Sequence, residues 1–466
     1  MSMIRGRCAL LAIFASGFLA ACSSDDDGGG VAHVAVVAMA PAEIGPRANI
    51  DATVEVTTGN GAPVRDAEVV FTVRRGGGTL GASDEPRVVT STVRSDADGR
   101  ASVPWTVGIA PVGNRLTASA GDEAVAFETR VVLAEPLQPE PFGDIPEFLR
   151  ENGYTAVDDE GQEVFLASTE DLAFVSDDRV VLGLAAGTST VTGALIEMNP
   201  AGEAALVDLE GEPLIGALGV AVDRDGVIWV ADPRGPAPGA LLRISTDGVV
   251  ETALTAIADV DLIAPNYVAV GPDGRIYVSD PCLGEIFRYD PVTAEVDALV
   301  TMDVATQGGP NGLAFDRSGD HLYFATESIA LLCMRFDLPP LDPVAGLFRV
   351  PVDAAGFGEV ETIAERRALF GDGLAFDDED NLYVIFDTQD EGMLEESAVW
   401  VLPAGETELV KFLANGERVY ANLAWGRGGF GAETLYISLL AINEFNLPIR
   451  GIDRIDLGIA GLPLLP

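Results

Sequence analysis

Four side chains with oxygen donors occupy one position of a repeated sequence pattern. They are two carboxylates and two amides, Glu170, Asn266, Asn311 and Asp372. Oxygen ligands without cysteine or histidine are typical of a site for a hard divalent cation, with calcium as the first choice. Two carboxylates that converged without a cation would repel each other and raise a pKa, and a cation removes that cost. The competing interpretation is that Asn-Gly and Asp-Gly pairs simply form turns.

Other catalytic chemistries are nearly excluded by composition. The chain has only two histidines, His33 near the N-terminus and His321 beside a predicted hairpin turn. A Ser-His-Asp triad or a zinc site with several histidines therefore lacks its residues. With 73 acidic against 28 basic residues and a net charge of -45, nucleic acid and anionic membrane surfaces are poor partners.

A sequence that repeats six times positions the four oxygen donors. Its hairpin-like copies include "NGLAFDRSGDHLYFATE" from Asn311 and "DGLAFDDEDNLYVIFD" from Asp372. The first strand residues of the copies follow at spacings of 48, 48, 45, 61 and 49, namely Leu172, Val220, Val268, Leu313, Leu374 and Leu423. Repeats of this period with several strands each predict a closed six-bladed β-propeller. The residue two before each first strand residue should face the central channel, where Leu218 and Ala421 take the two remaining places.

Four further acids end the predicted second strands of their copies, Asp232, Asp280, Glu327 and Asp387. These strands return to the same face as the oxygen donors, so the acids could support the site or contact substrate. Capping of turns at the strand ends is the favoured interpretation. Cys282 and Cys333 fall in neighbouring copies, and their pairing in a disulfide stays open.

The N-terminus predicts export and lipid anchoring. Residues 1–21 have a positive start and a short apolar run, as in a signal peptide. The run ends Leu19-Ala20-Ala21-Cys22, which resembles a bacterial lipoprotein lipobox and implies lipidation of Cys22. Residues 22–33 then form a flexible tether. The expected location is the envelope of a Gram-negative bacterium, most simply the outer membrane, with the lipid as the sole membrane contact.

Residues 34–134 predict a separate β-sandwich of short alternating strands. The stretches Gly61-Ala62-Pro63-Val64, Gly76-Gly77-Gly78-Thr79-Leu80 and Trp105 resemble bacterial Ig-like repeats of the intimin and invasin type. Such domains act as spacers or stalks. A Pro-rich linker over 135–148 precedes the propeller at 149–466. The predicted fold class is therefore all-β, a six-bladed β-propeller with an N-terminal Ig-like β-sandwich.

The propeller resembles the SMP-30/gluconolactonase family, which includes regucalcin. The resemblance rests on "PNGLAF" at 310–315, "GDGLAFDDEDNLYV" at 371–384 and "IDRIDLGIAGLPL" at 452–464. It implies a lactone hydrolase in which Glu170, Asn266, Asn311 and Asp372 bind one divalent cation and Asp372 also serves as general base. The implied cofactor is calcium, with magnesium, manganese or zinc as alternatives.

The chain departs from the family pattern beside the first amide. Ala264 stands where sugar-lactone members carry arginine, and Tyr267 stands where aspartate is frequent. A less polar lactone or a related ester is therefore the expected small-molecule substrate of a metal-dependent hydrolase. The alternative is a non-catalytic cell-envelope binding or adhesion lipoprotein whose metal is structural. Fold cannot choose between the two, and the sequence leaves the oligomeric state open.

Overall fold

The computed structural model describes residues 31–81, 87–157, 161, 163–186, 192–234, 238–328, 345–366, 368–390, 393–415, 419–440 and 451–463. The predicted signal peptide, Cys22 and Cys333 lie outside these ranges. In the described part of the chain, no helix is long and apolar enough to cross a membrane.

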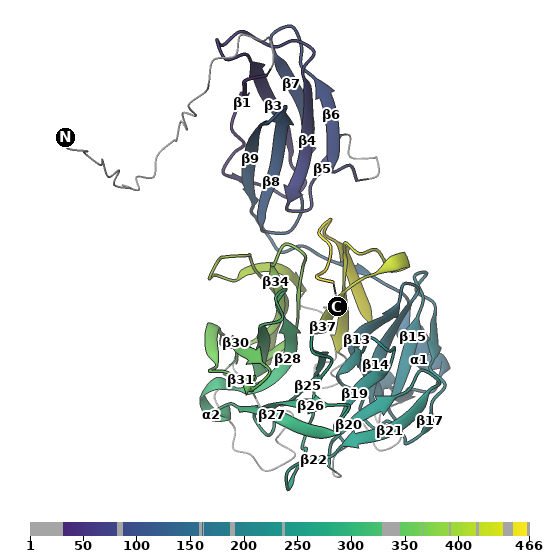
Figure 1. Cartoon of the computed structure of the whole chain (residues 1–466). Helices are drawn as coiled ribbons and strands as arrows, with labels where there is room; N and C mark the ends of the chain where they lie inside the picture. The colour runs from purple at the N-terminus through teal and green to yellow at the C-terminus, as the bar shows by residue number, and fades with distance from the viewer. Residues whose placement is uncertain are drawn as a thin grey trace, which may run out of the picture.

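The N-terminal part is a sandwich of two sheets (Figure 1). The four-stranded sheet has the order β1 (His33–Val36), β3 (Asn49–Thr57), β7 (Arg100–Thr106) and β5 (Thr79–Leu80). The five-stranded sheet has the order β2 (Glu43–Ile44), β9 (Glu123–Val131), β8 (Gly113–Ala120), β4 (Glu68–Arg75) and β6 (Thr90–Arg94). The Ig-like character of this sandwich stays a prediction.

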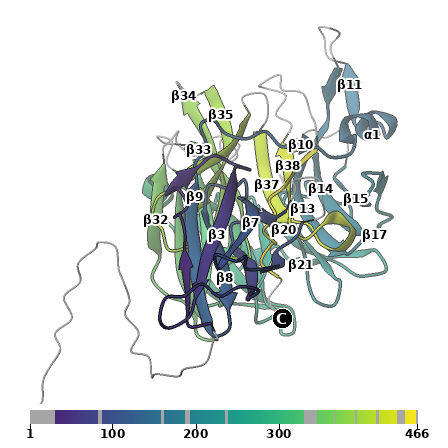
Figure 2. The ribbon, with the colours of Figure 1, turned by 90° about the horizontal axis from the view of Figure 1, so that it is seen from above.

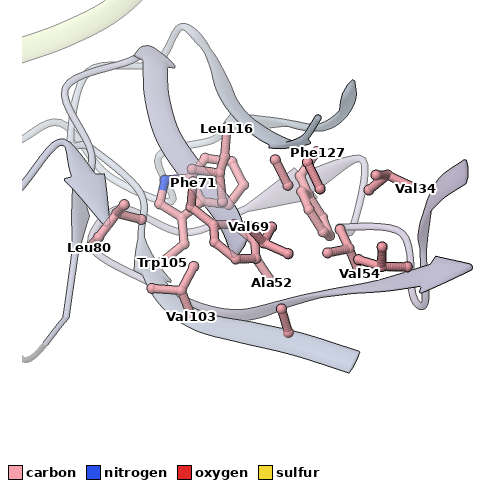
Figure 3. Close-up of a cluster of buried hydrophobic side chains, with 14 of the residues drawn as sticks. Val34, Ala52, Val54, Val69, Phe71, Leu80, Val103, Trp105, Leu116 and Phe127 are labelled. Carbon is pink, nitrogen blue, oxygen red and sulfur yellow. The ribbon is translucent and has the colours of Figure 1, made fainter. Parts of the chain in front are cut away.

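Alternating apolar residues build the sandwich core, because successive side chains of a strand point to opposite faces. Ala52, Val54 and Val56 of β3 are fully buried, while the residues between them reach the surface. Trp105 of β7 meets Phe71 of β4 from the opposite sheet in the same core, as Figure 3 shows. Trp105 is therefore a core residue.

Residues beyond the sandwich form six sheets, which we number blades 1 to 6 in chain order. Blade 1 contains β13 (Ala167–Ser176), β14 (Arg179–Ala186), β15 (Ala194–Met198) and β16 (Ala204–Leu206). Blade 2 contains β18 (Val220–Val222), β19 (Ile228–Asp232), β20 (Ala240–Ile244), β21 (Val249–Leu254) and the short edge strand β17 (Glu210–Gly211). Blade 3 contains β24 (Val268–Val270), β25 (Ile276–Asp280), β26 (Glu285–Asp290) and β27 (Glu295–Thr301).

The remaining blades follow the same order of strands. Blade 4 contains β28 (Gly309–Phe315), β29 (His321–Glu327), β30 (Ala345–Asp353), β31 (Gly356–Phe357) and β32 (Glu361–Arg366). Blade 5 contains β33 (Ala368–Phe376), β34 (Leu382–Asp390), β35 (Met393–Leu402) and β36 (Val410–Asn415). Blade 6 contains β37 (Val419–Trp425), β38 (Thr434–Leu440), β39 (Ile452–Asp456) and β10 (Glu140–Pro141).

The first strands of the six blades form a closed ring around a channel. β13 contacts β18, β18 contacts β24, β24 contacts β28, β28 contacts β33, β33 contacts β37, and β37 contacts β13. All six predicted first strand residues lie on these strands and are buried: Leu172, Val220, Val268, Leu313, Leu374 and Leu423. The fold is thus all-β with a six-bladed propeller, which confirms the prediction from the repeats.

The ring closes with a strand that comes from far upstream in the chain. In β10, Glu140 and Pro141 pair antiparallel with Arg454 and Asp453 of β39. The amide of Phe142 donates a hydrogen bond to the carbonyl of Ile452 at 2.8 Å. Because the outermost strand of blade 6 precedes blade 1 in sequence, the first and last blades hold each other in place.

Short elements complete the described structure. They are the helix α1 (Ile145–Glu151), the helix α2 (Val304–Gln307), the 3-10 helix η2 (Gly428–Phe430) and two hairpins, β11 (Thr155–Val157) with β12 (Glu163–Phe165) and β22 (Ala256–Ile257) with β23 (Val260–Asp261). The α1 helix follows β10 directly and packs Phe148 and Leu149 into the core shared by blades 1 and 6.

The sandwich contacts blades 5 and 6 at one end of the propeller (Figures 1 and 2). Ile109 and Val112 share a core with residues of those blades. The amide of Gly76 donates to both carboxylate oxygens of Glu379, each at 2.9 Å, and Arg87 pairs with Glu433. Both acids lie in turns that join the first and second strands of their blades. The sandwich therefore covers the end of the channel where first strands turn into second strands. The other end, where the second strands finish, faces away from the sandwich.

Candidate metal centre

Every first strand carries a β-bulge where it passes the channel. In blades 1, 4, 5 and 6, two successive paired residues lie three positions apart on the first strand but only two positions apart on the second strand. In blade 3, Asn266 and Tyr267 both hydrogen-bond to Ser279, and in blade 2, Leu218 and Gly219 both hydrogen-bond to Ala231. A bulge opposes two residues to one and re-aims a side chain.

The bulges create two layers of residues along the channel. The first layer is formed by the leading residue of each bulge: Glu170, Leu218, Asn266, Asn311, Asp372 and Ala421. The second layer is formed by the following residues: Asp171, Gly219, Tyr267, Gly312, Gly373 and Asn422. The alternation of a regular strand does not give this arrangement, so the repeated sequence pattern predicts only the first layer.

The structure buries all four predicted oxygen donors at equivalent positions of their blades, and contacts and charge effects link Glu170, Asn311 and Asp372 into one cluster. Glu170, Asn266, Asn311 and Asp372 come from blades 1, 3, 4 and 5 and are 8%, 3%, 1% and 6% exposed. The charge of Glu170 acts on Asp372 although blades 1 and 5 are not neighbours in the ring. These side chains therefore face the channel, and Asn311 is a channel residue and not part of a surface turn.

Two of the strand-end acids belong to the same cluster. The side-chain nitrogen Nδ2 of Asn311 lies 3.4 Å from Oε2 of Glu327, and Glu327 is 1% exposed. Asp387 is fully buried and accepts a hydrogen bond from the hydroxyl of Ser397. Its charge acts on both Glu170 and Asp372. The preference for turn capping is thus wrong for Glu327 and Asp387.

The other two strand-end acids do cap backbone. Asp232 accepts a hydrogen bond from the amide of Gly216 at 2.6 Å. Asp280 accepts hydrogen bonds from the amides of Ile263, Ala264, Cys282 and Leu283. Both acids fix the loops that lead into their own blades. Asp280 also caps the turn after its strand, as the sequence predicted, whereas Asp232 does not in the described structure.

Several polar atoms of the cluster have no hydrogen-bond partner in the described structure. They are Oε2 of Glu170, Nδ2 of Asn266, Oδ1 of Asn311, Oε1 of Glu327 and Oδ2 of Asp387. A buried polar atom without a partner costs about 1–3 kcal/mol, so five of them in one place indicate a missing ligand. Four of the five are oxygens, as a hard cation requires.

Burial dominates the electrostatics of the cluster. Burial, assisted by the charge of Asp387, raises the pKa of Glu170 to about 8. Burial also raises the pKa of Glu327 and of Asp387 to about 8. The pKa of Asp372 lies well above its usual range because of burial and then because of Glu170, Glu327 and Asp387. The cation-free channel therefore favours protonated carboxyls, whereas a bound cation would favour the ionised forms.

The second layer closes the channel with a chain of hydrogen bonds. The hydroxyl of Tyr267 donates to the side-chain oxygen of Asn422 at 3.1 Å, and the amide group of Asn422 donates to Asp171. Asp171 also accepts from the amide of Val220 at 2.7 Å. These three side chains come from blades 3, 6 and 1, so they span the channel, and we call them the channel floor.

The remaining places of the second layer are glycines because the channel leaves them no room. A Cβ atom on Gly312 would lie 2.3 Å from the carbonyl oxygen of Asp372, and one on Gly373 would lie 2.0 Å from the side-chain oxygen of Asn422. Gly312 and Gly373 do not adopt positive φ angles. The Asn-Gly and Asp-Gly pairs therefore reflect close packing around the channel and not turn geometry.

The cluster fits a cation through carboxylate and amide oxygens together. Among the described residues, no three histidine, cysteine, aspartate or glutamate side chains converge as a metal-binding group. The amides of Asn266 and Asn311 would have to supply the remaining ligands. Neither histidine takes part, since His33 lies in β1 of the sandwich and His321 contacts Asp316 beside its hairpin turn. Such a donor set suits calcium better than zinc.

Two cavities of about 560 Å³ lie away from this cluster. One is lined by Tyr154 and by residues 206–209 and 211–214 of blades 1 and 2. The other lies between the sandwich and blade 6, beside Arg47 and Arg454. Neither contains a residue of either channel layer. Cys282 is disulfide-bonded, and Cys333, whose pairing with it the sequence left open, lies outside the described residues.

Comparisons give structural likeness without sequence relatives. No protein-family model and no curated protein sequence matches this chain. A gluconolactonase from Xanthomonas campestris is 15% identical with a TM-score of 0.45, over 71% of this chain and 99% of that one. A calcium-binding regucalcin from Agrobacterium tumefaciens is 16% identical with a TM-score of 0.46, over 70% and 96%. At these identities and TM-scores the likeness says nothing about activity.

Proposed function

We propose that this chain is a divalent-metal-dependent hydrolase of lactones or related esters. The observation that supports it is the burial of Glu170, Asn266, Asn311 and Asp372 at equivalent positions of four blades, where Oε2 of Glu170 and Oδ1 of Asn311 have no hydrogen-bond partner in the described structure. Calcium is the proposed cation, with magnesium, manganese or zinc as alternatives. When bound, it would polarise the carbonyl of the substrate and stabilise the oxyanion that develops.

The residues of the chain would bind the cation and move the proton of the attacking water. Glu170 and Asp372 would supply charge to the cation, and the amide oxygens of Asn266 and Asn311 would complete its ligands. Asp372 would take the proton from the attacking water, as a general base. Asp372 is buried, and the charges of Glu170, Glu327 and Asp387 act on its carboxylate.

The channel floor would set the depth that the substrate reaches. Tyr267 and Asp171 each form a hydrogen bond with Asn422, so the three side chains would block passage through the propeller. Leu218 and Ala421 make two sides of the first layer apolar. With Ala264 in place of an arginine, this lining favours a lactone or ester of low polarity over a sugar acid lactone.

We further propose that the protein is anchored in the Gram-negative cell envelope through lipid on Cys22. The support is the signal-like sequence of residues 1–22. The sandwich would then act as a spacer between the membrane and the propeller. Because it contacts the end of the propeller away from the second-strand ends, it would leave the channel accessible to substrate.

A binding protein with a structural cation is the second candidate. It is favoured by the sandwich, which resembles a stalk, and by the missing arginine at position 264. The two functions differ in their response to a chelator. An enzyme would lose turnover, whereas a binding protein would lose only stability or affinity.

The test is hydrolysis by the full chain on a panel of lactones and aryl esters, with calcium and with chelator. We expect calcium-dependent turnover that falls by a factor of about 10² or more in Asp372→Asn. Asp380→Asn is the matched control, because Asp380 is an exposed acid in the hairpin turn of the same blade. A folded protein that hydrolyses no substrate with any divalent cation would refute the hydrolase and leave the binding protein.

A further inference from the structure

The four strand-end acids occupy two different positions of their second strands. Each second strand has a residue that pairs with the buried first strand residue of its blade, and the acids can be counted from it. Glu327 and Asp387 are the third residue after it, whereas Asp232 and Asp280 are the second. Because successive side chains of a strand point to opposite sides, blades 4 and 5 turn their acids to the channel and blades 2 and 3 turn theirs away.

Uncharged residues take the corresponding channel positions of blades 2 and 3. Pro233 and Pro281 are the third residues in this count, where blades 4 and 5 have acids. The first layer differs in the same direction, since blade 2 contributes Leu218 and blade 3 contributes the neutral Asn266. At these positions the carboxylates therefore lie on blades 1, 4 and 5, and the wall of blades 2 and 3 carries no charge.

Asp232 and Asp280 each fix a loop that has an isoleucine at the same place. Asp232 accepts a hydrogen bond from the amide of Ile215 at 3.3 Å, and Asp280 accepts one from the amide of Ile263 at 2.8 Å. Each isoleucine lies three residues before the first-layer residue of its blade, at the end of the channel where the second strands finish. Ile215 is 37% exposed there. In both blades, a buried acid therefore holds an isoleucine at the mouth of the channel.

Leu218 continues this apolar wall into the channel. It is 8% exposed, yet among the described residues it belongs to none of the hydrophobic cores of the propeller. Since a buried leucine ordinarily packs into such a core, this side chain faces the channel. The order of the ring places blade 2 across the channel from blade 5. Leu218 therefore lies opposite Asp372, and a molecule bound at Asp372 would extend toward Leu218.

We infer that blades 2 and 3 form an apolar subsite, made by Leu218, Ile215 and Ile263, that binds an alkyl substituent of the substrate. This inference rests on the proposed function, which places the reacting carbonyl on the opposite side of the channel. Covering exposed apolar side chains with an alkyl group removes both from water, which favours binding. The substrate class that fits is a lactone or ester with an alkyl chain on the side away from the cation. Asp232 and Asp280 are positioning residues of this subsite.

The experiment measures kcat/KM of the full chain with calcium on γ-lactones whose alkyl substituent grows from methyl to hexyl. We expect kcat/KM to rise by up to about fourfold per added methylene, the factor for moving a methylene from water to an apolar site. Leu218→Asn nearly keeps the shape of the side chain. It should lower the ratio of kcat/KM between the hexyl and methyl lactones by a factor of about 10 or more. This ratio does not depend on the fraction of active protein.

Further variants separate the subsite from general effects on the protein. Ile215→Asn should lower the same ratio. Leu206→Asn is the matched control and should not, because Leu206 is an exposed leucine on the outer strand β16 of blade 1. Asp232→Ala should lower the ratio by releasing the loop, whereas Asp232→Asn keeps an acceptor for the loop amides and should retain most of it.

The outcomes distinguish the subsite from the reaction. Hydrolysis with a flat wild-type series would overturn the subsite and leave the proposed function intact, even if a variant failed to fold. An unchanged ratio in both Leu218→Asn and Ile215→Asn would do the same. Hydrolysis of none of the lactones by a folded wild-type chain would overturn both.

Discussion

At the scale of single residues, burial decides the chemistry of the cluster. Glu170, Glu327 and Asp387 are ordinary acids in sequence, but the channel raises the pKa of each to about 8. Ionised carboxylates in this cluster therefore destabilise the folded protein unless protons or a cation neutralise them. This property gives a prediction about pH.

The stability of the cation-free protein should fall as pH rises from about 4.5 to about 8. In this window the unfolded chain has released protons that the folded chain still holds, so each added unit of pH favours unfolding. With chelator present, we expect the Tm to be lower at pH 8.5 than at pH 5 by on the order of 5 °C. Calcium should restore much of this loss at pH 8.5, when the carboxylates are ionised.

Thermal unfolding followed by circular dichroism measures both effects. Glu327→Gln is the informative variant, since it removes one of the titrating groups and should reduce the fall. A Tm that rose between pH 5 and pH 8.5 in chelator would contradict the raised pKa values.

At the scale of elements, the β-bulges and the glycines at their second positions together shape the inner strands. The bulge turns two consecutive residues toward the channel, and the second must be small wherever a neighbouring strand passes close by. Gly312 meets the backbone of Asp372, and Gly219 meets the backbone of Asn266. The packing of these glycines therefore sets the spacing of the strands that carry the site.

Gly312→Ala should destabilise the propeller by about 1–3 kcal/mol, because its Cβ would press on a backbone carbonyl that cannot move freely. Gly113→Ala is the matched control. Gly113 also lies in a strand, and a Cβ there would meet nothing within 4 Å. The control should change stability by less than about 0.5 kcal/mol.

Denaturant unfolding of the two variants makes the comparison. If Gly312→Ala and Gly113→Ala were equally stable, the inner strands of blades 4 and 5 would be able to move apart without a loss of stability. The calcium affinity of Gly312→Ala should also fall, since the altered strand carries Asn311.

At the scale of the whole molecule, the segment between sandwich and propeller is part of the propeller. Residues 137–142 join blades 5 and 6, through a bridge from Leu137 to Leu413 and through β10. Phe142 is 4% exposed in the core shared by blades 1 and 6. A propeller without this segment would leave the last blade with an open edge.

A chain that begins at Gly143 should therefore be less stable than one that begins at Ala134. Both lack the sandwich, and only the shorter one lacks β10 and Phe142. We expect a loss of about 3–5 kcal/mol from Phe142 alone, seen as a lower Tm and as association in size-exclusion chromatography. Equal Tm values would show that β10 does not contribute to closure.

The ring of six blades and the first layer of the channel follow from the repeated pattern of the chain. Six copies of one hairpin, with Leu172, Leu313 and Leu374 at equivalent places, specify a propeller because period and alternation are local properties of the chain. The same equivalence placed Glu170, Asn266, Asn311 and Asp372 around one axis. The sequence also excluded histidine chemistry, because composition needs no structure.

The choice of acids that join the site depends on contacts between blades, which the sequence pattern does not show. Asp232, Asp280, Glu327 and Asp387 look alike in sequence, and their roles divide according to whether a loop amide or the channel lies beside them. The bulges, the channel floor and the closing strand β10 likewise depend on groups far apart in the chain. Contacts between blades set these features, and a pattern within one copy does not contain that information.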